Sequence, residues 1–123
     1  VVKPGVSDKL VCQMDLLASL AALIGQSYSD RTDSQNTLPV FLGQAGNGRQ
    51  ELVIEGMFDY AFRQGDWVML PPYPGKNREY ELYNIKEDPM QQNNLADKER
   101  KRLRQMMMRF EQLKRETQKI TDF

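Results

Sequence analysis

The sequence predicts an α+β fold: a small antiparallel sheet of about four strands, packed against a long C-terminal helix, plus an apolar helix near the N-terminus. Three observations predict it. Short runs of β-branched and aromatic residues lie between residues 52 and 85, separated by turn residues. From residue 97 onward, apolar residues recur every three or four positions, which is the period of a helix. Residues 16–24 are almost all apolar.

The first helix is predicted over residues 15–25. Asp15 precedes the apolar run and is a favoured N-cap, because its carboxylate can accept the unpaired amide protons of the first turn. Gly25 suits the C′ position, where a left-handed backbone is needed. A helix that is apolar on all sides is expected to be buried. In a chain of 123 residues, with room for one modest core, we expect one flank of it to lack a partner.

Irregular structure is predicted on both sides of this helix. Residues 6–12 look extended, and residues 26–37 read as a polar surface loop. Residues 38–43 predict one helical turn, with Pro39 at its first position and Gly43 closing it. Residues 45–48 predict a turn.

The four strand candidates are short and separated by turn residues. The link Gln64-Gly65-Asp66 between the second and third is short enough for a tight hairpin, so antiparallel neighbours are expected. A longer loop covers residues 71–78, before the last candidate. The predicted strands are residues 52–55, 60–63, 67–70 and 80–85.

The C-terminal helix is predicted to begin near Asp97, which is a plausible N-cap, with Asn94 as a competing cap. Its apolar residues share one face, and burying that face requires the helix to lie across one side of the sheet. The residues of this face are Leu103, Met106, Met107, Phe110, Leu113 and Ile120.

Charge is balanced overall, with 17 basic and 17 acidic residues, so no global field indicates a nucleic-acid partner. Residues 98–123 nevertheless carry nine Lys or Arg against four Asp or Glu. Such a run is usually the solvated face of a surface helix. No apolar run is long enough to cross a membrane, and the first residues do not resemble a signal peptide. Together with the missing initiator methionine, these features lead us to expect a fragment of a longer chain.

Candidate catalytic and metal-binding groups are few. Histidine is absent, which removes the usual general base. The single cysteine, Cys12, is expected to be a small buried hydrophobe. Asp30, Asp33 and Asp88 form no calcium-loop pattern. We therefore expect no catalytic, cofactor-binding or metal-binding residue in this chain.

Glycines and aromatic residues have structural explanations as well. Gly43, Gly46 and Gly48 precede a predicted strand, whereas a phosphate-binding loop follows one. Met106, Met107 and Met108 include two residues of the predicted helix core face. Exposed rings on a sheet could stack on bases or sugars, but aromatic residues at alternate strand positions are more often core. The residues concerned are Tyr60, Trp67, Tyr80 and Tyr83.

Several segments resemble the C-terminal part of sulfatases, in the family's order. Residues 79–96 combine a strand, an Asp-Pro turn and Asn-Leu-Ala, like the family's Glu-Leu-Tyr-Asp-Leu…Asp-Pro…Asn-Leu-Ala. Residues 15–25 are similar to Asp-Leu-Leu-Pro-Thr-Leu…Gly, with Ala18-Ser19 in place of Pro-Thr. Residues 33–43 are similar to the Leu-Leu-Pro-x-Leu-x-Gly element. Residues 61–70 are similar to Ala-Ile-Arg-x-Gly-Asp-Trp-Lys-Leu-Ile, with Val68 in place of Lys.

The resemblance implies that residues 1–43 end the sulfatase large domain and that residues 44–123 form the C-terminal subdomain. The parent enzyme would hydrolyse sulfate esters with formylglycine and calcium in an N-terminal domain outside this chain. Cys12-Gln13-Met14-Asp15-Leu16 lacks the Pro or Ala and the Arg that direct conversion of cysteine to formylglycine. The chain alone is thus expected to be inactive. The implied compartment of the parent is secreted, periplasmic or lysosomal.

The expected partner is the N-terminal domain of the same parent, with self-association through residues 16–24 when that domain is absent. Neither nucleic acid nor membrane is expected. The loops 26–37 and 71–78 are candidates to border a substrate cleft, with Tyr73 and Arg78 as residues to test. The alternative is a self-contained protein- or ligand-binding module that uses the basic helix 98–119 or the sheet face.

Overall fold

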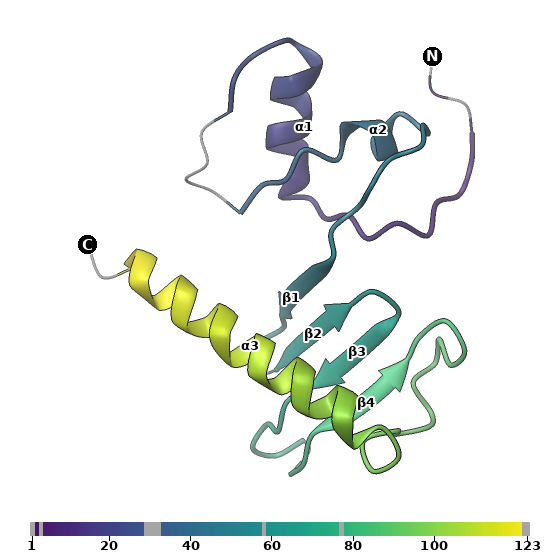
Figure 1. The fold of residues 1–123 in the computed structure, drawn as a ribbon, viewed down its shortest axis with the longest axis vertical. Helices are drawn as coiled ribbons and strands as arrows, with labels where there is room; N and C mark the ends of the chain where they lie inside the picture. The colour runs from purple at the N-terminus through teal and green to yellow at the C-terminus, as the bar shows by residue number, and fades with distance from the viewer. Residues whose placement is uncertain (1, 3, 29–32, 58, 77, 122–123) are drawn as a thin grey trace. The chain divides into compact units, whose positions relative to one another are not determined.

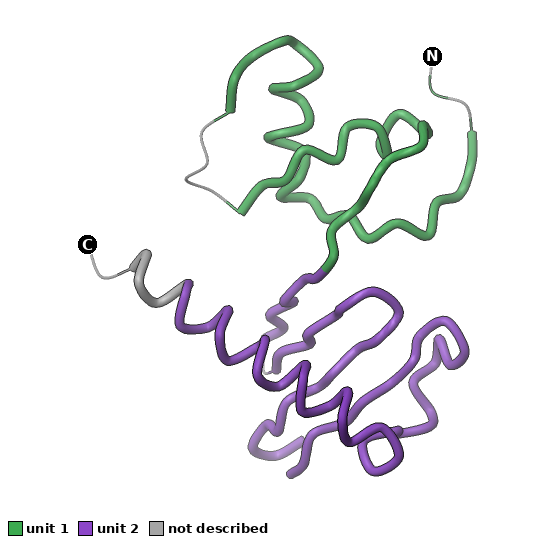
Figure 2. Tube along the Cα trace, in the orientation of Figure 1, with its two compact units in different colours: residues 1–50 green, residues 51–123 purple. Residues whose placement is uncertain are grey.

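The computed structural model describes residues 2, 4–28, 33–57, 59–76 and 78–121, with the side chains of the last helix described as far as Glu116 (Figure 1). The chain forms two compact units, residues 1–50 and 51–123 (Figure 2). The sequence predicts a boundary after residue 43, between the large domain and the C-terminal subdomain of a longer protein. That boundary stays a prediction. No helix within the described ranges has both the length and the apolar character of a membrane span.

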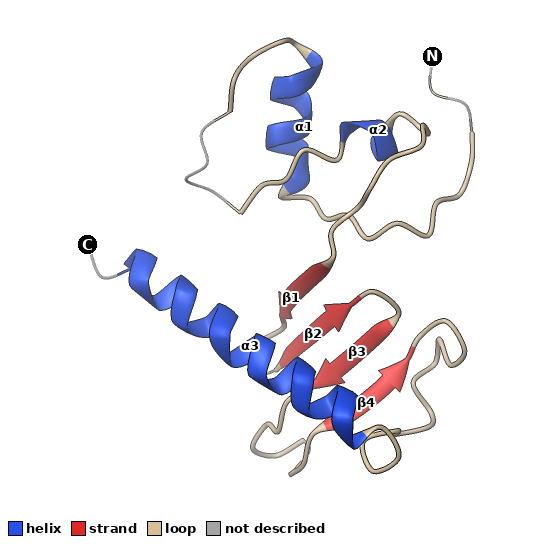
Figure 3. Ribbon diagram, viewed as in Figure 1, coloured by secondary structure: helices blue, strands red, loops and turns tan. Residues whose placement is uncertain are grey.

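The first unit contains two helices, α1 (Asp15–Leu23) and α2 (Leu38–Phe41), joined by irregular segments (Figure 3). Both helices are closed by the predicted glycines, although their helical residues end at Leu23 and Phe41, two residues before the predicted limits at 25 and 43. Gly25 and Gly43 have φ of 71° and 69°, and the next amide in each case reaches back to the third residue from the helix end. This pair of turns satisfies carbonyl groups that the helices leave free, which is why glycine is favoured at both positions.

The prediction that Asp15 caps α1 is wrong. Met14 occupies the cap position, and Asp15 is the first helical residue, with its side chain turned into the unit and fully buried. A cap carboxylate binds amides of its own helix. This carboxylate instead binds groups from elsewhere in the first unit, as described below.

The second unit is an antiparallel sheet in the order β1-β2-β3-β4, followed by the long helix α3 (Figure 3). All four predicted strands and their antiparallel pairing are confirmed within one or two residues. Gly65, at φ 58°, begins the two-residue turn between the second and third strands. The elements are β1 (Glu51–Glu55), β2 (Tyr60–Gln64), β3 (Trp67–Leu70), β4 (Glu81–Asn84) and α3 (Arg100–Thr121).

α3 lies across one face of the sheet (Figure 1), and a row of apolar side chains crosses the sheet on that face. The register aligns Val53, Phe62, Met69 and Leu82 in neighbouring strands. Phe62, Met69 and Leu82 are fully buried, and they form one cluster with Met106 and Phe110 of α3. The predicted core face of the helix is therefore confirmed as far as Leu113, while the side chain of Ile120 lies outside the described residues.

The predicted start of the last helix is wrong by three residues. α3 begins at Arg100, and the Asp97 side chain is 95% exposed beside Arg100. Asn94 is not its cap either, because its side-chain oxygen accepts the amides of Leu82 and Ala96. Asn94 thus ties the turn before the helix to β4.

Candidate functional site

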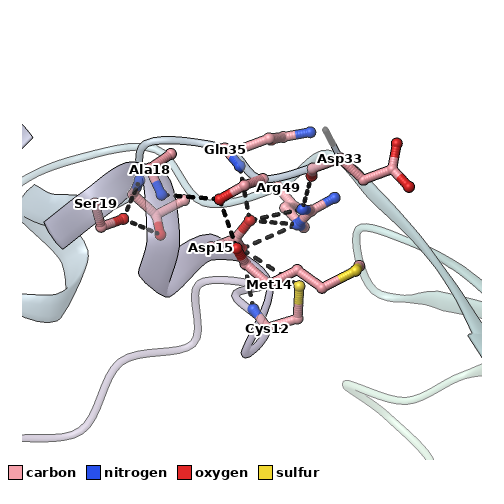
Figure 4. A network of polar contacts seen from close by, with 10 residues as sticks. Cys12, Met14, Asp15, Ala18, Ser19, Asp33, Gln35 and Arg49 are labelled. Atoms are coloured by element: carbon pink, nitrogen blue, oxygen red, sulfur yellow. Dashed lines mark hydrogen bonds and ion pairs between the residues drawn. The ribbon is translucent and has the colours of Figure 1, made fainter. Parts of the chain in front are cut away.

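The most connected polar site in the first unit is centred on Asp15 and Arg49 (Figure 4). Arg49 approaches α1 from the end of the unit, and its side chain is only 6% exposed. The guanidinium Nε lies 2.9 Å from both carboxylate oxygens, and a terminal nitrogen lies 2.6 Å from Oδ1. This is a buried, multiply hydrogen-bonded ion pair, the geometry that arginine forms with carboxylates best.

Backbone groups complete the site. The amide of Cys12 donates to Asp15 Oδ2 at 3.0 Å, and the amide of Gln35 donates to Oδ1 at 3.1 Å. The Cys12 thiol lies 3.6 Å from Oδ2, and Arg49 donates a further hydrogen bond to the Asp33 carbonyl. The network joins α1, the segment before it, the loop after it and the end of the unit.

Both members of the pair are held in their charged forms. Burial by itself raises the pKa of Asp15, but the hydrogen bonds from Arg49, Cys12 and Gln35 outweigh it, so the pKa lies below its usual value. Burial likewise lowers the pKa of Arg49, but the hydrogen bonds and charge of Asp15 more than offset this, so its pKa is raised.

Small polar side chains extend the network along the same face of α1. Thr37 donates its amide to Ser19 Oγ at 3.0 Å, and both side chains are buried. Ser34 Oγ accepts the Ala18 amide at 2.9 Å and donates to the Met14 carbonyl at 2.5 Å. The inward face of α1 is therefore small and polar rather than leucine-rich.

The apolar face of α1 is turned outward as a consequence. At 100° per residue its large apolar side chains fall within about 120° of one another, opposite the buried Ala18. Their exposed fractions range from 44% to 71%, which confirms that one flank of this helix lacks cover in the structure. The residues of this apolar flank are Leu16, Leu17, Leu20, Leu23 and Ile24.

The Asp15–Arg49 network can fix the conformation of the first unit, but its geometry does not suit catalysis. The carboxylate is fully buried, and its oxygens already accept five hydrogen bonds from four donor groups. A general base must instead reach a substrate proton with a free lone pair. The Cys12 thiol is used inside the network, so the predicted apolar role of Cys12 is incomplete: it is half-buried and polar in its contacts.

The acidic residues considered for a cation do not come together. The backbone carbonyl of Asp33 accepts a hydrogen bond from Arg49. The Asp88 carboxylate accepts the Asn93 amide at 2.7 Å, and this bond is the main reason that its pKa is lowered. Asp30 lies outside the described residues. Within the described ranges no group of three or more His, Cys, Asp or Glu is arranged to hold a metal ion.

Close packing against the Leu10 backbone requires glycine at position 48. The amide of Arg49 donates to the Leu10 carbonyl at 2.6 Å, so two chain segments run in contact. A Cβ on Gly48 would collide with the Leu10 backbone. This glycine therefore allows the close approach that places Arg49 beside Asp15.

The aromatic side chains of the sheet are used mainly in packing. Trp67 lies under the Arg102 guanidinium at 4.5 Å, and Tyr60 packs 6.2 Å from the Phe110 ring. Tyr83 is buried on the other side of the sheet and donates to Glu81 at 2.8 Å. Burial, followed by this hydrogen bond, raises the pKa of Tyr83 to about 12.

A shallow hollow of about 430 Å³ lies in the first unit, between the N-terminal segment and α2. The described residues that line it include Val6, Phe41 and Gln44, and none of them is ionisable. Of the two loops considered for a substrate cleft, residues 29–32 and 77 are outside the described ranges. In the second loop Tyr73 is half-buried and Arg78 is exposed.

Comparison with known proteins finds sulfatases that are similar to most of the chain. No family model matches. The chain is 29% identical, over 128 aligned positions, to an N-acetylgalactosamine-6-O-sulfatase of Bacteroides thetaiotaomicron, covering 92% of this chain and 25% of that protein. A solved 6S-sulf structure, described with the metabolism of multiple glycosaminoglycans by the same organism, superposes with a TM-score of 0.72 at 28% identity. That match covers 81% of this chain and 24% of the other.

A more distant structure, a 2-O GAG sulfatase, shares the fold, with a TM-score of 0.58 at 22% identity over 88% of this chain and 25% of that one. The chain thus spans about a quarter of the length of the proteins it matches. Its relatives are sulfatases, and the extent of the match is consistent with a C-terminal sulfatase subdomain.

Proposed function

We propose that this chain is the C-terminal subdomain of an enzyme that hydrolyses sulfate esters of sugars. The observation that carries the proposal is the sulfatase match over 92% of the chain, together with the fold shared with the 6S-sulf structure. A 6-O-sulfated amino sugar is the first substrate to test, since the sequence relative is an N-acetylgalactosamine-6-O-sulfatase.

The proposed chemistry belongs to the parent's catalytic domain. Formylglycine and calcium are the groups that the resemblance implies, and the residues described here do not fit either of them. Cys12 lacks the flanking conversion motif and its thiol is engaged with Asp15. The described carboxylates form no cluster that could bind calcium. We therefore assign no catalytic step to this chain.

The proposed role of the first unit is to dock on the catalytic domain through the apolar flank of α1. Burying a leucine side chain stabilises an interface by roughly 1.5–3 kcal/mol. Five large apolar side chains on one helix face are also more than the scattered exposed residues of an ordinary surface. In the isolated chain we expect the same flank to drive self-association.

The docking role can be tested on the chain itself. Sedimentation should show concentration-dependent association, and a hydrophobic dye should bind. Replacing Leu17 and Leu20 with Ser should reduce both signals, while the same change at the exposed Met57 and Met90 in the second unit should not. A clean monomer that binds no dye would support the alternative of a self-contained module using the basic helix or the sheet face.

Activity is tested by comparing this chain with the longer protein that contains it. We expect the chain alone to leave an aryl sulfate and a 6-O-sulfated N-acetylgalactosamine intact in the presence of calcium. The longer protein should hydrolyse them, and its coding sequence should contain Cys-x-Pro-x-Arg or Cys-x-Ala-x-Arg upstream of Val1. Turnover by the isolated chain above a buffer control would refute the proposal.

We also propose that the loop around Tyr73 and Arg78 borders the substrate cleft of the parent. Its length and polarity support this, as does the exposure of Arg78. Tyr73→Phe and Arg78→Gln in the longer protein should alter the preference among sulfated sugars, while Lys86→Gln serves as a control outside the loop. Unchanged specificity in both variants would count against this role.

The proposed compartment of the parent is secreted, periplasmic or lysosomal.

A further inference from the structure

A strip of basic side chains runs along the solvent side of α3. Lys101, Arg104 and Arg115 are all exposed, and Met108, 61% exposed, lies between them. At 100° per residue these four positions fall within about 60° of one another. They lie opposite the buried Met106, so the strip points away from the core that holds the helix on the sheet.

The strip differs from the other basic side chains of α3 that the structure describes, between Arg100 and Glu116, because these have partners in the second unit. Arg102 lies over the Trp67 ring at 4.5 Å. Arg109 is bound to Glu51 of β1 at 2.6 Å, and Lys114 lies 3.3 Å from Glu111. These side chains serve packing or are locally neutralised, and they are not counted in the strip.

The three strip residues have no ion-pair partner among the described side chains, and Glu111, at the edge of the strip about 20° from Arg104, pairs with Lys114. Among the described residues, no carboxylate lies within ion-pair distance of Lys101, Arg104 or Arg115. The chain as a whole is neutral, so this positive field is local to one helix face. From Lys101 to Arg115 the helix rises about 21 Å, at roughly 1.5 Å per residue.

This arrangement suits a long anion better than a small one. A compact anion could reach only one or two of these side chains at a time. A linear polymer with repeated negative groups can follow the helix axis and meet the charges in turn. Its binding energy would come from the sum of exposed, salt-sensitive contacts rather than from a pocket.

We propose that the outer face of α3, through Lys101, Arg104 and Arg115, binds a sulfated polysaccharide chain. The identity of the polymer rests on the proposed function, since sulfate esters are the groups that a sulfatase meets on its substrate. The strip would then hold the substrate polymer on the enzyme.

The test measures binding by the 123-residue chain, which needs no catalytic activity. The probes are chondroitin sulfate and the same polymer after chemical desulfation. A triple variant, K101Q/R104Q/R115Q, is compared with K9Q/K76Q/K86Q, which removes three exposed lysines elsewhere and changes the net charge equally. Glutamine keeps a high helix propensity, and circular dichroism checks that α3 is retained.

We expect the unmodified chain to bind the sulfated polymer and not the desulfated one. By the counterion-release argument for three contacts, affinity should fall about 20- to 40-fold between roughly 50 and 200 mM salt. The strip variant should lose about tenfold in affinity at the lower salt, while the control stays within about twofold. Equal losses in the two variants, equal binding to the desulfated polymer, or tighter binding to duplex DNA would each overturn the proposal.

The binding result and the proposed activity can fail separately. If the strip does not bind the polymer but the longer protein hydrolyses sulfate esters, only the role of the strip is refuted. If the strip binds with the expected pattern and the longer protein has no such activity, the proposed function is refuted while the binding surface remains.

Discussion

Replacing Asp15 with Asn should destabilise the first unit strongly. The variant keeps the size of the side chain and removes the charge that neutralises Arg49, which would stay buried with a side chain only 6% exposed. Removing one partner of a buried ion pair typically costs about 3–5 kcal/mol, because the remaining charge is uncompensated. The equilibrium for opening the first unit should therefore rise by roughly two to three and a half orders of magnitude.

Hydrogen exchange can measure this change in the right unit. The amides of Cys12 and Gln35 donate directly to Asp15, and the amide of Thr37 belongs to the adjoining network. Their exchange should accelerate by the factor given above, up to the limit set by global unfolding. The Met69 amide in the sheet of the second unit serves as an internal reference.

Asp97→Asn is the matched control for the same chemical change. That carboxylate is 95% exposed and lies 3.4 Å from Arg100, and exposed pairs of this kind contribute roughly 0–1 kcal/mol. If the Cys12 and Gln35 amides exchanged at the same rate in the Asp15→Asn and Asp97→Asn variants, the claim that the buried pair stabilises the first unit would be refuted.

The remaining predictions concern acid, the core and a turn. Since the folded pKa of Asp15 is lowered, its stabilising contribution is present above the unfolded value of about 3.9 and is lost as pH falls through the lower folded value. An acid titration followed at the first-unit amides should show this loss, and the Asp15→Asn variant should not. Met106→Ala should lower the free energy of unfolding by about 2–5 kcal/mol, measured by urea unfolding followed by Trp67 fluorescence. The same change at the exposed Met108 should lower it by less than about 0.5 kcal/mol. Gly65→Ala forces an alanine to φ 58° and should cost roughly 1–2 kcal/mol in the same assay, and no loss would contradict the turn geometry.

Much of the second unit could be predicted because its signals are local. β-branched and aromatic runs separated by turn residues identified four strands, and the short link at Gly65 indicated an antiparallel hairpin. The three- and four-residue spacing of Met106 and Phe110 identified the face of α3 that the sheet covers. The start of α3 was misplaced at Asp97, since capping residues recur in this stretch and helix boundaries are weakly encoded.

The Asp15–Arg49 site could not be predicted in the same way. Asp15 before an apolar helix is indistinguishable, by local pattern, from an N-cap. Arg49 lies 34 positions later and adjoins it only because Gly48 lets the chain pass close to Leu10. The one available signal was an acidic residue and a serine on a helix that is otherwise apolar, and that signal does not identify a partner.

The sequence by itself determined which segments become strands and helices, where glycine ends α1 and α2, and which family the chain resembles. These features depend on residues near one another along the chain. Only the tertiary structure decided that α1 buries its small polar face and leaves its leucines exposed. A helix with apolar residues on every side has no period that favours one face. The buried Asp15–Arg49 ion pair decides which face of α1 lies inward, because charged groups that leave water must be paired and hydrogen-bonded.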